Sequence, residues 1–184
     1  MGLLRQLDNV INMKKSILVF LGSGGHFEQA FRLISKLGNK FEYELVYIKG
    51  DKTAKARMGS LVKKEKLVVT QEYTIPLLRI VSESRIRNFA YLFYGPLVCL
   101  LNSFSIVMRS RAKYFLSAGN GAAVFLYYFG KIFGKKLIYL ETWSRVWTPS
   151  LTGRLVYPIC NLFFVQWPEL LEKYPKAKYV GRLG

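Results

Sequence analysis

Short apolar runs alternate with segments of helical periodicity along most of this chain. Strands are predicted over residues 16–21, 43–48, 67–70, 114–117, 136–140, 162–165 and 179–180. Helices are predicted over residues 26–37, 122–133 and 168–173, and a further helix closes at 157–161. Several runs are apolar throughout, which is typical of parallel strands buried on both faces. The alternation therefore predicts an α/β fold over residues 16–184, with a Rossmann-like, doubly wound parallel sheet.

The first predicted strand leads into a turn of small residues. The turn reads Gly22, Ser23, Gly24, Gly25 and His26. Glycines let the backbone turn tightly and leave N–H groups bare, and the helix that follows adds the positive end of its dipole. A strand, a glycine turn and a helix N-terminus together form an anion site. An ordinary strand-to-helix turn with a surface histidine is the alternative interpretation.

This turn is neither of the common nucleotide-binding motifs. A Walker loop ends in Gly-Lys-Ser/Thr, and no lysine follows here. The dinucleotide fingerprint needs a third spaced glycine, which is missing, although Glu42 and Glu44 lie near the expected acidic position. His26 is the only histidine of the chain, and its presence in the turn indicates acid–base or phosphate chemistry instead.

Two further polar clusters follow later strands, at residues 117–121 and 141–145. Their candidate site residues are Gly119, Asn120, Gly121, Glu141 and Arg145. Ligands of open parallel sheets bind outside the carboxyl ends of the strands, so both clusters should meet the first turn at one edge. Asn120 either binds a sugar hydroxyl or takes the left-handed turn conformation that asparagine tolerates. Glu141 and Arg145 either contact substrate or pair with each other.

Two segments have the character of membrane-associated helices. Residues 1–15 hold no signal peptide and form an amphipathic helix, which lies in a bilayer interface or docks on its own domain. Residues 88–108 carry no charge, have basic flanks and are long enough to span a bilayer. Strands of one sheet lie before and after them, and Pro96 would kink the helix, so we expect no simple span. We expect a helix that packs on the sheet and dips into the interface, with an internal core helix as the alternative.

The charge balance narrows the class of ligand. The chain has 28 basic and 11 acidic residues, a net charge of +17, and 51% hydrophobic residues. Such a surface attracts polyanions, and the high apolar content favours anionic membrane lipid over nucleic acid. The basic stretch 50–66 is expected to be a loop or a short exposed helix. Cys99 and Cys160 lack disulfide-framework and metal spacing, so buried thiols are expected, with neither a metal nor a cofactor.

Several motifs together resemble one family over about residues 15–184. They are the turns at 22–26 and 117–121, the run Glu141-Thr142-Trp143-Ser144-Arg145, and the ending from Phe164 to Leu183. The combination resembles the membrane-anchoring subunit of the two-part N-acetylglucosaminyltransferase of the dolichol pathway. It is similar to bacterial relatives that act in exopolysaccharide and capsule synthesis. The first turn also looks like that of the peptidoglycan N-acetylglucosaminyltransferase.

The resemblance implies the N-terminal, acceptor-binding half of a GT-B glycosyltransferase. A separate small subunit would bind the UDP-sugar, and this chain would hold a polyprenyl-diphosphate-linked sugar at the cytoplasmic face of the cell membrane. The enzyme would be inverting and would require both subunits. Eukaryotic members carry an N-terminal transmembrane helix, whereas here there is only the amphipathic segment 1–15, so the mode of anchoring is expected to differ. They also carry a basic motif that residues 82–87 match only loosely, which favours a bacterial polysaccharide acceptor over a dolichol-linked one.

Inverting transfer requires a base for the acceptor hydroxyl and groups that support the diphosphate leaving group. We expect His26 to be the base or an acceptor-positioning residue, with Glu141 as the second candidate base. The residues expected to bind the acceptor and its phosphates are Gly22, Ser23, Gly24, Gly25, Gly119, Asn120, Gly121 and Arg145. The competing hypothesis is a non-catalytic membrane scaffold that recruits the catalytic subunit. A nucleic-acid-binding domain, which charge alone would favour, lacks a recognition motif here.

Overall fold

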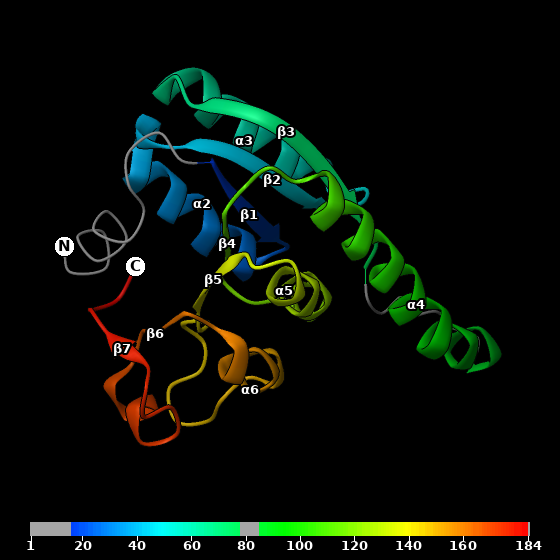
Figure 1. Ribbon diagram of the computed structural model, residues 1–184, viewed down its shortest axis with the longest axis vertical. Coiled ribbons are helices and arrows are strands. Elements are labelled where there is room, and N and C mark those ends of the chain that lie inside the picture. The colour runs from blue at the N-terminus through cyan, green and yellow to red at the C-terminus, as the bar shows by residue number, and fades with distance from the viewer. Residues whose placement is uncertain (1–15, 78–84, 184) are drawn as a thin grey trace.

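A parallel sheet lies between two layers of helices in the computed structural model, which describes residues 16–77 and 85–183 (Figure 1). The strands are β1 Ser16–Gly22, β2 Glu42–Ile48, β3 Val68–Ile75, β4 Tyr114–Ser117, β5 Lys136–Leu140, β6 Leu162–Val165 and β7 Lys178–Tyr179. Their order is β3-β2-β1-β4-β5-β6-β7, and each neighbouring pair is parallel. The prediction of a doubly wound α/β fold is confirmed. The helix predicted over residues 1–15 lies outside the described residues.

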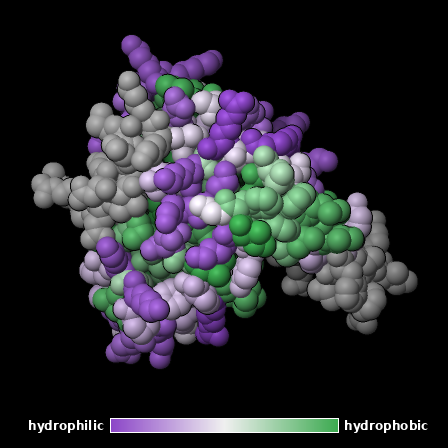
Figure 2. All heavy atoms as spheres, in the orientation of Figure 1, coloured by the Kyte–Doolittle hydropathy of each residue, from purple (hydrophilic) through white to green (hydrophobic). Residues whose placement is uncertain are grey.

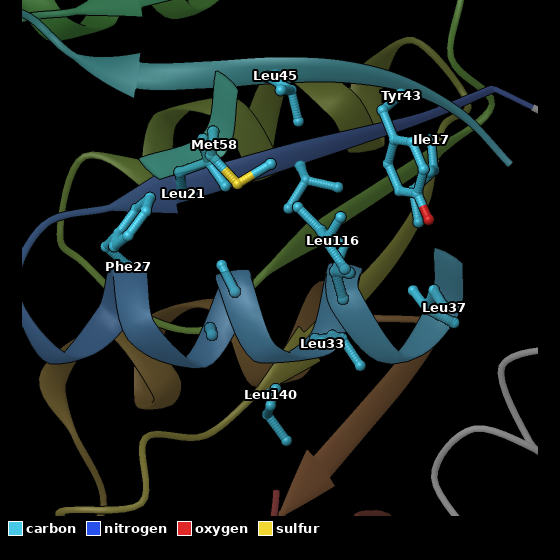
Figure 3. Packing of buried hydrophobic residues seen from close by; sticks show 14 of the residues in the cluster. Ile17, Leu21, Phe27, Leu33, Leu37, Tyr43, Leu45, Met58, Leu116 and Leu140 are labelled. Atoms are coloured by element: carbon cyan, nitrogen blue, oxygen red, sulfur yellow. The ribbon is translucent and has the colours of Figure 1, made fainter. Parts of the chain in front are cut away.

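Helices cover both faces of the sheet because its central strands are apolar on both faces. Helices α2 (Gly25–Leu37) and α3 (Lys52–Glu65) pack on one face, and α4 (Arg85–Arg109), α5 (Ala123–Ile132) and α6 (Leu151–Val156) pack on the other. Alternate residues of β1 enter the two cores, with Ile17 facing α2 and Leu18 facing α5. Figure 3 shows Phe27 and Leu37 of α2 packed against β1.

Of the two expectations for the basic stretch 50–66, a loop or a short exposed helix, the helix is the one that forms. The stretch forms α3, a helix of 14 residues whose N-cap Asp51 accepts a hydrogen bond from Ala54 N at 2.9 Å. Three apolar residues of α3 are buried against the core, namely Ala54, Met58 and Leu61. Their spacing of four and three residues places them on one helix face, which is enough to dock an otherwise charged helix.

The charge-free segment 88–108 lies within α4, which continues through Pro96 as one helix. Its described part packs Cys99, Ile106 and Val107 into the core, so the prediction that it packs on the sheet is confirmed. Among the described residues, no helix combines the length and the apolarity needed to cross a bilayer. The predicted helical segments near the C-terminus are short 3₁₀ turns, η2 Tyr157–Ile159 after α6 and η3 Pro168–Glu172.

The strand order reverses between β1 and β4. The chain builds β1, β2 and β3 outward in one direction and then crosses through α4 to place β4 on the other side of β1. At this point the chain leaves β1 and β4 toward opposite faces of the sheet, into α2 and α5, which makes this the switch point where ligands of such sheets bind. The fold therefore places residues 22–26 beside residues 117–121.

Candidate functional site

A pocket of about 280 Å³ lies at the switch point between β1 and β4. Its walls come from α2, from the turn after β4, from β5 and from the segment that leads into α6. The lining residues are His26, Gly119, Asn120, Gly121, Tyr139, Thr142, Ser144, Arg145, Ser150, Leu151 and Thr152. Most of these polar groups are neutral, and Arg145 is the charged exception. Such a lining suits a ligand that has many hydroxyl groups and an anionic part.

His26 is held against the second turn of small residues. Its Nδ1 lies 2.9 Å from the backbone oxygen of Ala118. A carbonyl oxygen can only accept, so this bond assigns the proton of the neutral ring to Nδ1. Nε2 then carries the lone pair. A neutral imidazole with a fixed, unprotonated Nε2 is in the right tautomer to take a proton from a hydroxyl group.

The close approach of the two turns depends on glycine. Gly119 has φ +112°, and a Cβ there would lie 2.5 Å from His26 Cε1 and overlap Nδ1. Gly22 has φ +66°, and a Cβ there would lie 2.9 Å from His26 Cβ. Neither separation is one that packed carbon atoms adopt, so both glycines make room for the imidazole.

Asn120 takes the left-handed conformation considered for it, with φ +77°. Its Oδ1 accepts a hydrogen bond from Ala122 N at 3.1 Å, just before α5 begins. The side chain therefore supports the turn as well as lining the pocket.

The structure brings together some of the predicted site residues and separates others. His26, Gly119, Asn120, Gly121 and Arg145 line one pocket. The remaining turn residues, from 22 to 25, flank that pocket without lining it. Gly24 and Gly25 are exposed, and α2 begins at Gly25 at the carboxyl edge of the sheet. The His26 N–H donates to Ser23 O at 3.2 Å, so this part of the turn is already satisfied by the backbone.

Glu141 does not open onto the pocket. Its side chain is fully buried, and Oε1 accepts from Thr142 N at 2.9 Å. Oε2 accepts from Tyr174 Oη at 3.1 Å and from Ser150 N at 3.3 Å. Burial, followed by the Glu141 charge, raises the pKa of Tyr174, so this phenol remains a donor. The carboxylate thus ties the end of β5 to the start of α6.

The ion pair considered for Glu141 and Arg145 does not form between these two described residues. Arg145 is exposed at the pocket mouth, where its Nη1 lies 3.5 Å from Thr148 Oγ1. Its guanidinium therefore remains largely available to an anion.

A buried amide pair underlies the site and was missed by the sequence reasoning. Gln29 is fully buried on α2, where its Oε1 accepts from Gln166 Nε2 at 2.6 Å and from Trp143 N at 3.0 Å. Gln166 Nε2 also donates to the Glu141 backbone oxygen at 2.9 Å, and its Oε1 accepts from Leu183 N at 3.1 Å. The available signal was a glutamine within the apolar stripe of the helix at 26–37. These bonds fix the loop after β5 relative to α2.

The described residues contain no group of three or more histidine, cysteine, aspartate or glutamate side chains placed to hold a metal ion. The two cysteines are free, with Cys99 buried and Cys160 half-buried. Burial raises the pKa of the Cys99 thiol to about 11, so it stays protonated at neutral pH.

Comparison with solved structures places the fold among glycosyltransferases. MurG of Acinetobacter baumannii matches with a TM-score of 0.59 and 13% identity, covering 84% of this chain and 42% of that chain. UGT89C1 of Arabidopsis thaliana, complexed with quercetin, matches with a TM-score of 0.61 and 13% identity, covering 93% and 51%. This chain therefore spans about half the length of these enzymes. At such identities the likeness shows the fold, which is the Rossmann-like half of a GT-B glycosyltransferase.

Sequence comparison identifies the family. The family described as "Oligosaccharide biosynthesis protein Alg14 like" matches residues 17–183. The UDP-N-acetylglucosamine transferase subunit alg14 of Schizosaccharomyces pombe is 33% identical over 91% of this chain and 83% of its own length. The mouse subunit ALG14 is 32% identical, with 91% and 82% covered. The chain belongs to the Alg14 family and is a glycosyltransferase subunit, as the resemblance implied.

Proposed function

We propose that this chain is the acceptor-binding subunit of an inverting glycosyltransferase whose donor is bound by a separate subunit. The relatives are named UDP-N-acetylglucosamine transferase subunits, which supports UDP-N-acetylglucosamine as the donor. The relatives are named as subunits of a transferase, which supports a partner that completes the enzyme. The observation that carries the proposal is the pocket at the switch point, which is lined by a His26 whose Nδ1 is held by Ala118 O.

The acceptor in this proposal is a sugar on a polyprenyl diphosphate. The glycine turn and the first turn of α2 offer N–H groups to the diphosphate, and Arg145 adds a positive charge at the pocket mouth. The neutral hydroxyl and amide groups of the inner wall then contact the sugar. A bacterial polysaccharide precursor remains our favoured acceptor within this class.

We assign proton abstraction to His26 and a positioning role to Glu141. His26 lines the pocket and is in the tautomer that a base requires. Glu141 was the second candidate base, but its burial and its three hydrogen bonds favour support of the β5–α6 connection. These bonds hold the carboxylate within the protein, away from the pocket lining.

We further propose peripheral attachment to the cytoplasmic face of the cell membrane through an apolar face made by α4, α5 and α6. Its exposed residues are Tyr94, Leu97, Leu101, Phe104, Met108, Tyr128, Ile132, Phe133, Leu151 and Leu155. The five residues of α4 recur every three or four positions, and apolar side chains gather over α4 in Figure 2. Scattered apolar residues are ordinary on protein surfaces, whereas a continuous face spread over three helices indicates a docking surface.

Charge and pocket position favour an anionic membrane as the partner of this apolar face. Exposed Arg109, Lys131 and Arg154 lie at or near the ends of the three helices, where they would meet lipid headgroups. Leu151 both lines the pocket and is 73% exposed, so the pocket opens beside the apolar face. An acceptor could then place its sugar in the pocket while its polyprenyl chain stays in the membrane. The free thiols of Cys99 and Cys160 support a reducing compartment.

The test is turnover of radiolabelled UDP-N-acetylglucosamine by the chain assembled with its donor-binding partner on lipid-linked acceptors. His26→Ala should lower kcat by about a hundredfold, the scale of a lost general base, while the partner still co-purifies. Arg145→Ala should raise the acceptor KM, and Arg57→Ala is its matched control because Arg57 is exposed on α3, on the opposite face of the sheet, and does not line the pocket.

Three outcomes would contradict the proposal in different ways. Turnover by the purified single subunit would remove the need for a donor-binding partner. Unchanged kcat and KM in both the His26 and the Arg145 variants would support the scaffold hypothesis, in which the partner subunit supplies all catalytic residues. A raised acceptor KM with unchanged kcat in His26→Ala would mean that His26 binds the acceptor but does not take its proton.

A further inference from the structure

Tyr139 is a fully buried residue of β5 that lines the pocket, and its hydroxyl group has no partner. The residue is 0% exposed and lines the pocket, and its Oη forms no hydrogen bond with any described residue. Buried hydroxyl groups are almost always hydrogen-bonded, because burial removes the water that would otherwise bind them. An unpaired one in a pocket wall therefore indicates a group that arrives with the ligand.

Packing alone does not explain a tyrosine at this position. The ring stacks on Phe163 at a centroid distance of 5.1 Å and meets the edge of Tyr127 at 6.0 Å. A phenylalanine would keep both ring contacts and would not bury an unpaired oxygen. Tyr127 differs, since its own hydroxyl donates to the backbone oxygen of Ile138. Ring packing therefore explains an aromatic residue at position 139 but does not explain its hydroxyl group.

The nearest polar neighbours do not satisfy this hydroxyl. Ser150 Oγ, which lowers the pKa of Tyr139 against the larger effect of burial, accepts from Gly153 N at 2.8 Å and forms no hydrogen bond with Tyr139 Oη. The Glu141 carboxylate is occupied by Thr142, Ser150 and Tyr174. The phenol is therefore left free to turn toward the pocket.

The charges around the Tyr139 hydroxyl favour a neutral ligand atom over an anionic one. Burial, and then the charge of Glu141, raise the pKa of Tyr139 well above its ordinary value, so the phenol remains a donor. The same buried carboxylate repels anions, so a phosphate oxygen is disfavoured here. The neighbouring lining groups Thr142, Ser150 and Thr152 are neutral, whereas positively charged Arg145 is exposed at the mouth.

We propose that Tyr139 Oη donates a hydrogen bond to a neutral oxygen of the acceptor sugar, a ring hydroxyl or an amide carbonyl, and so helps to select the sugar. This inference rests on the proposed function, because it takes the pocket to be the acceptor site. The phosphates would bind at the glycine turn and Arg145, and the sugar would lie deeper, against β5. A site that hydrogen-bonds a substrate oxygen discriminates against analogues that lack it, because its own polar group is then left unpaired.

The experiment compares Tyr139→Phe with wild type in the assembled transferase. The probes are phytanyl-diphosphate-linked N-acetylglucosamine, glucose and galactose, together with single-deoxy analogues of the best substrate. Tyr139→Phe should raise the acceptor KM about tenfold on the best substrate, as expected for one lost hydrogen bond. On the analogue that lacks the partner oxygen, wild type and variant should be equal. The thermal midpoint of the variant should equal or exceed that of wild type, because no hydrogen bond within the protein is lost.

Tyr127→Phe is the matched control, since it removes a buried phenol next to Tyr139 that does not line the pocket. It should lower the thermal midpoint and leave the ranking of acceptors unchanged. Kinetic constants of Tyr139→Phe within twofold of wild type on every acceptor would overturn the inference, and so would an equal loss on all deoxy analogues. A lowered thermal midpoint for Tyr139→Phe would also overturn it, because the hydroxyl would then be bonded within the protein.

Failure of the proposed function would look different. The wild-type assembly would then neither turn over any of these acceptors nor gain thermal stability from them, and this inference would fall with it. Turnover in wild type that Tyr139→Phe leaves unchanged would overturn the inference alone.

Discussion

Adding a single methyl group at Gly119 should remove most of the activity while the protein still folds. The residue follows β4 with φ +112°, and its missing side chain leaves room for the imidazole of His26. In Gly119→Ala the new Cβ would lie 2.5 Å from Cε1 and overlap Nδ1. The ring must therefore rotate away, and the 2.9 Å bond from Nδ1 to Ala118 O must break.

Two costs to the free energy of unfolding add up in this variant. An alanine held at positive φ costs about 1–2 kcal/mol. Loss of the Nδ1 hydrogen bond costs about 1 kcal/mol more. The sum of about 2–3 kcal/mol corresponds to a fall of about 4–12 °C in the thermal midpoint of a chain of this size. A displacement of the base by about 1 Å should also lower kcat by about a hundredfold.

Gly134→Ala is the matched control for this prediction. Gly134 also has positive φ, +68°, but nothing lies within 4 Å of a Cβ built there, and it lies outside the pocket. It should lower the midpoint by a few degrees and leave turnover unchanged. The assays are differential scanning fluorimetry of the assembled complex and its turnover under saturating donor. If Gly119→Ala kept turnover within threefold of wild type, the placement of His26 by this turn would be refuted as the basis of its activity.

Three further predictions follow from other parts of the molecule. Gly153→Ala should lower the free energy of unfolding, measured in urea, by about 2–4 kcal/mol, because its Cβ would overlap Glu141 Oε2. An unchanged urea midpoint would show that the Glu141 carboxylate does not stabilise this part of the fold. Leu101→Glu should reduce flotation with vesicles containing anionic lipid at least fivefold, whereas Val68→Glu, at an exposed position of β3, should not; equal losses would contradict docking through the apolar face. Burial raises the pKa of Tyr73 to about 12, so the folded state holds this proton more tightly than the unfolded chain, and stability should fall between pH 10 and 12. Tyr73→Phe should flatten that fall in urea titrations, and an identical alkaline profile would show that another group is responsible.

The order and type of most elements could be predicted from local pattern. Apolar runs such as residues 17–21 are stable as strands that are buried on both faces. The glycines after them indicate where each strand ends. Residues 52–65 show the limit of this reasoning. Only three apolar residues dock α3, and their weak pattern lay among many lysines and arginines. The helix is stabilised by packing of these residues against the core, and periodicity alone does not report that contribution.

The meeting of the polar clusters also followed from sequence, because the carboxyl ends of parallel strands share one edge. Which atoms face the pocket did not follow, since that depends on contacts between residues far apart in the chain. Tyr139 lies in β5, and Glu141 directly follows the strand. Residues leading into α6 and Tyr174 cover Glu141, whereas Tyr139 lines the pocket and its hydroxyl group has no partner. Local sequence was therefore enough to predict that these clusters share one edge of the sheet. Tertiary packing satisfied the polar group of Glu141 and left that of Tyr139 unpaired, because their partners come from distant parts of the chain.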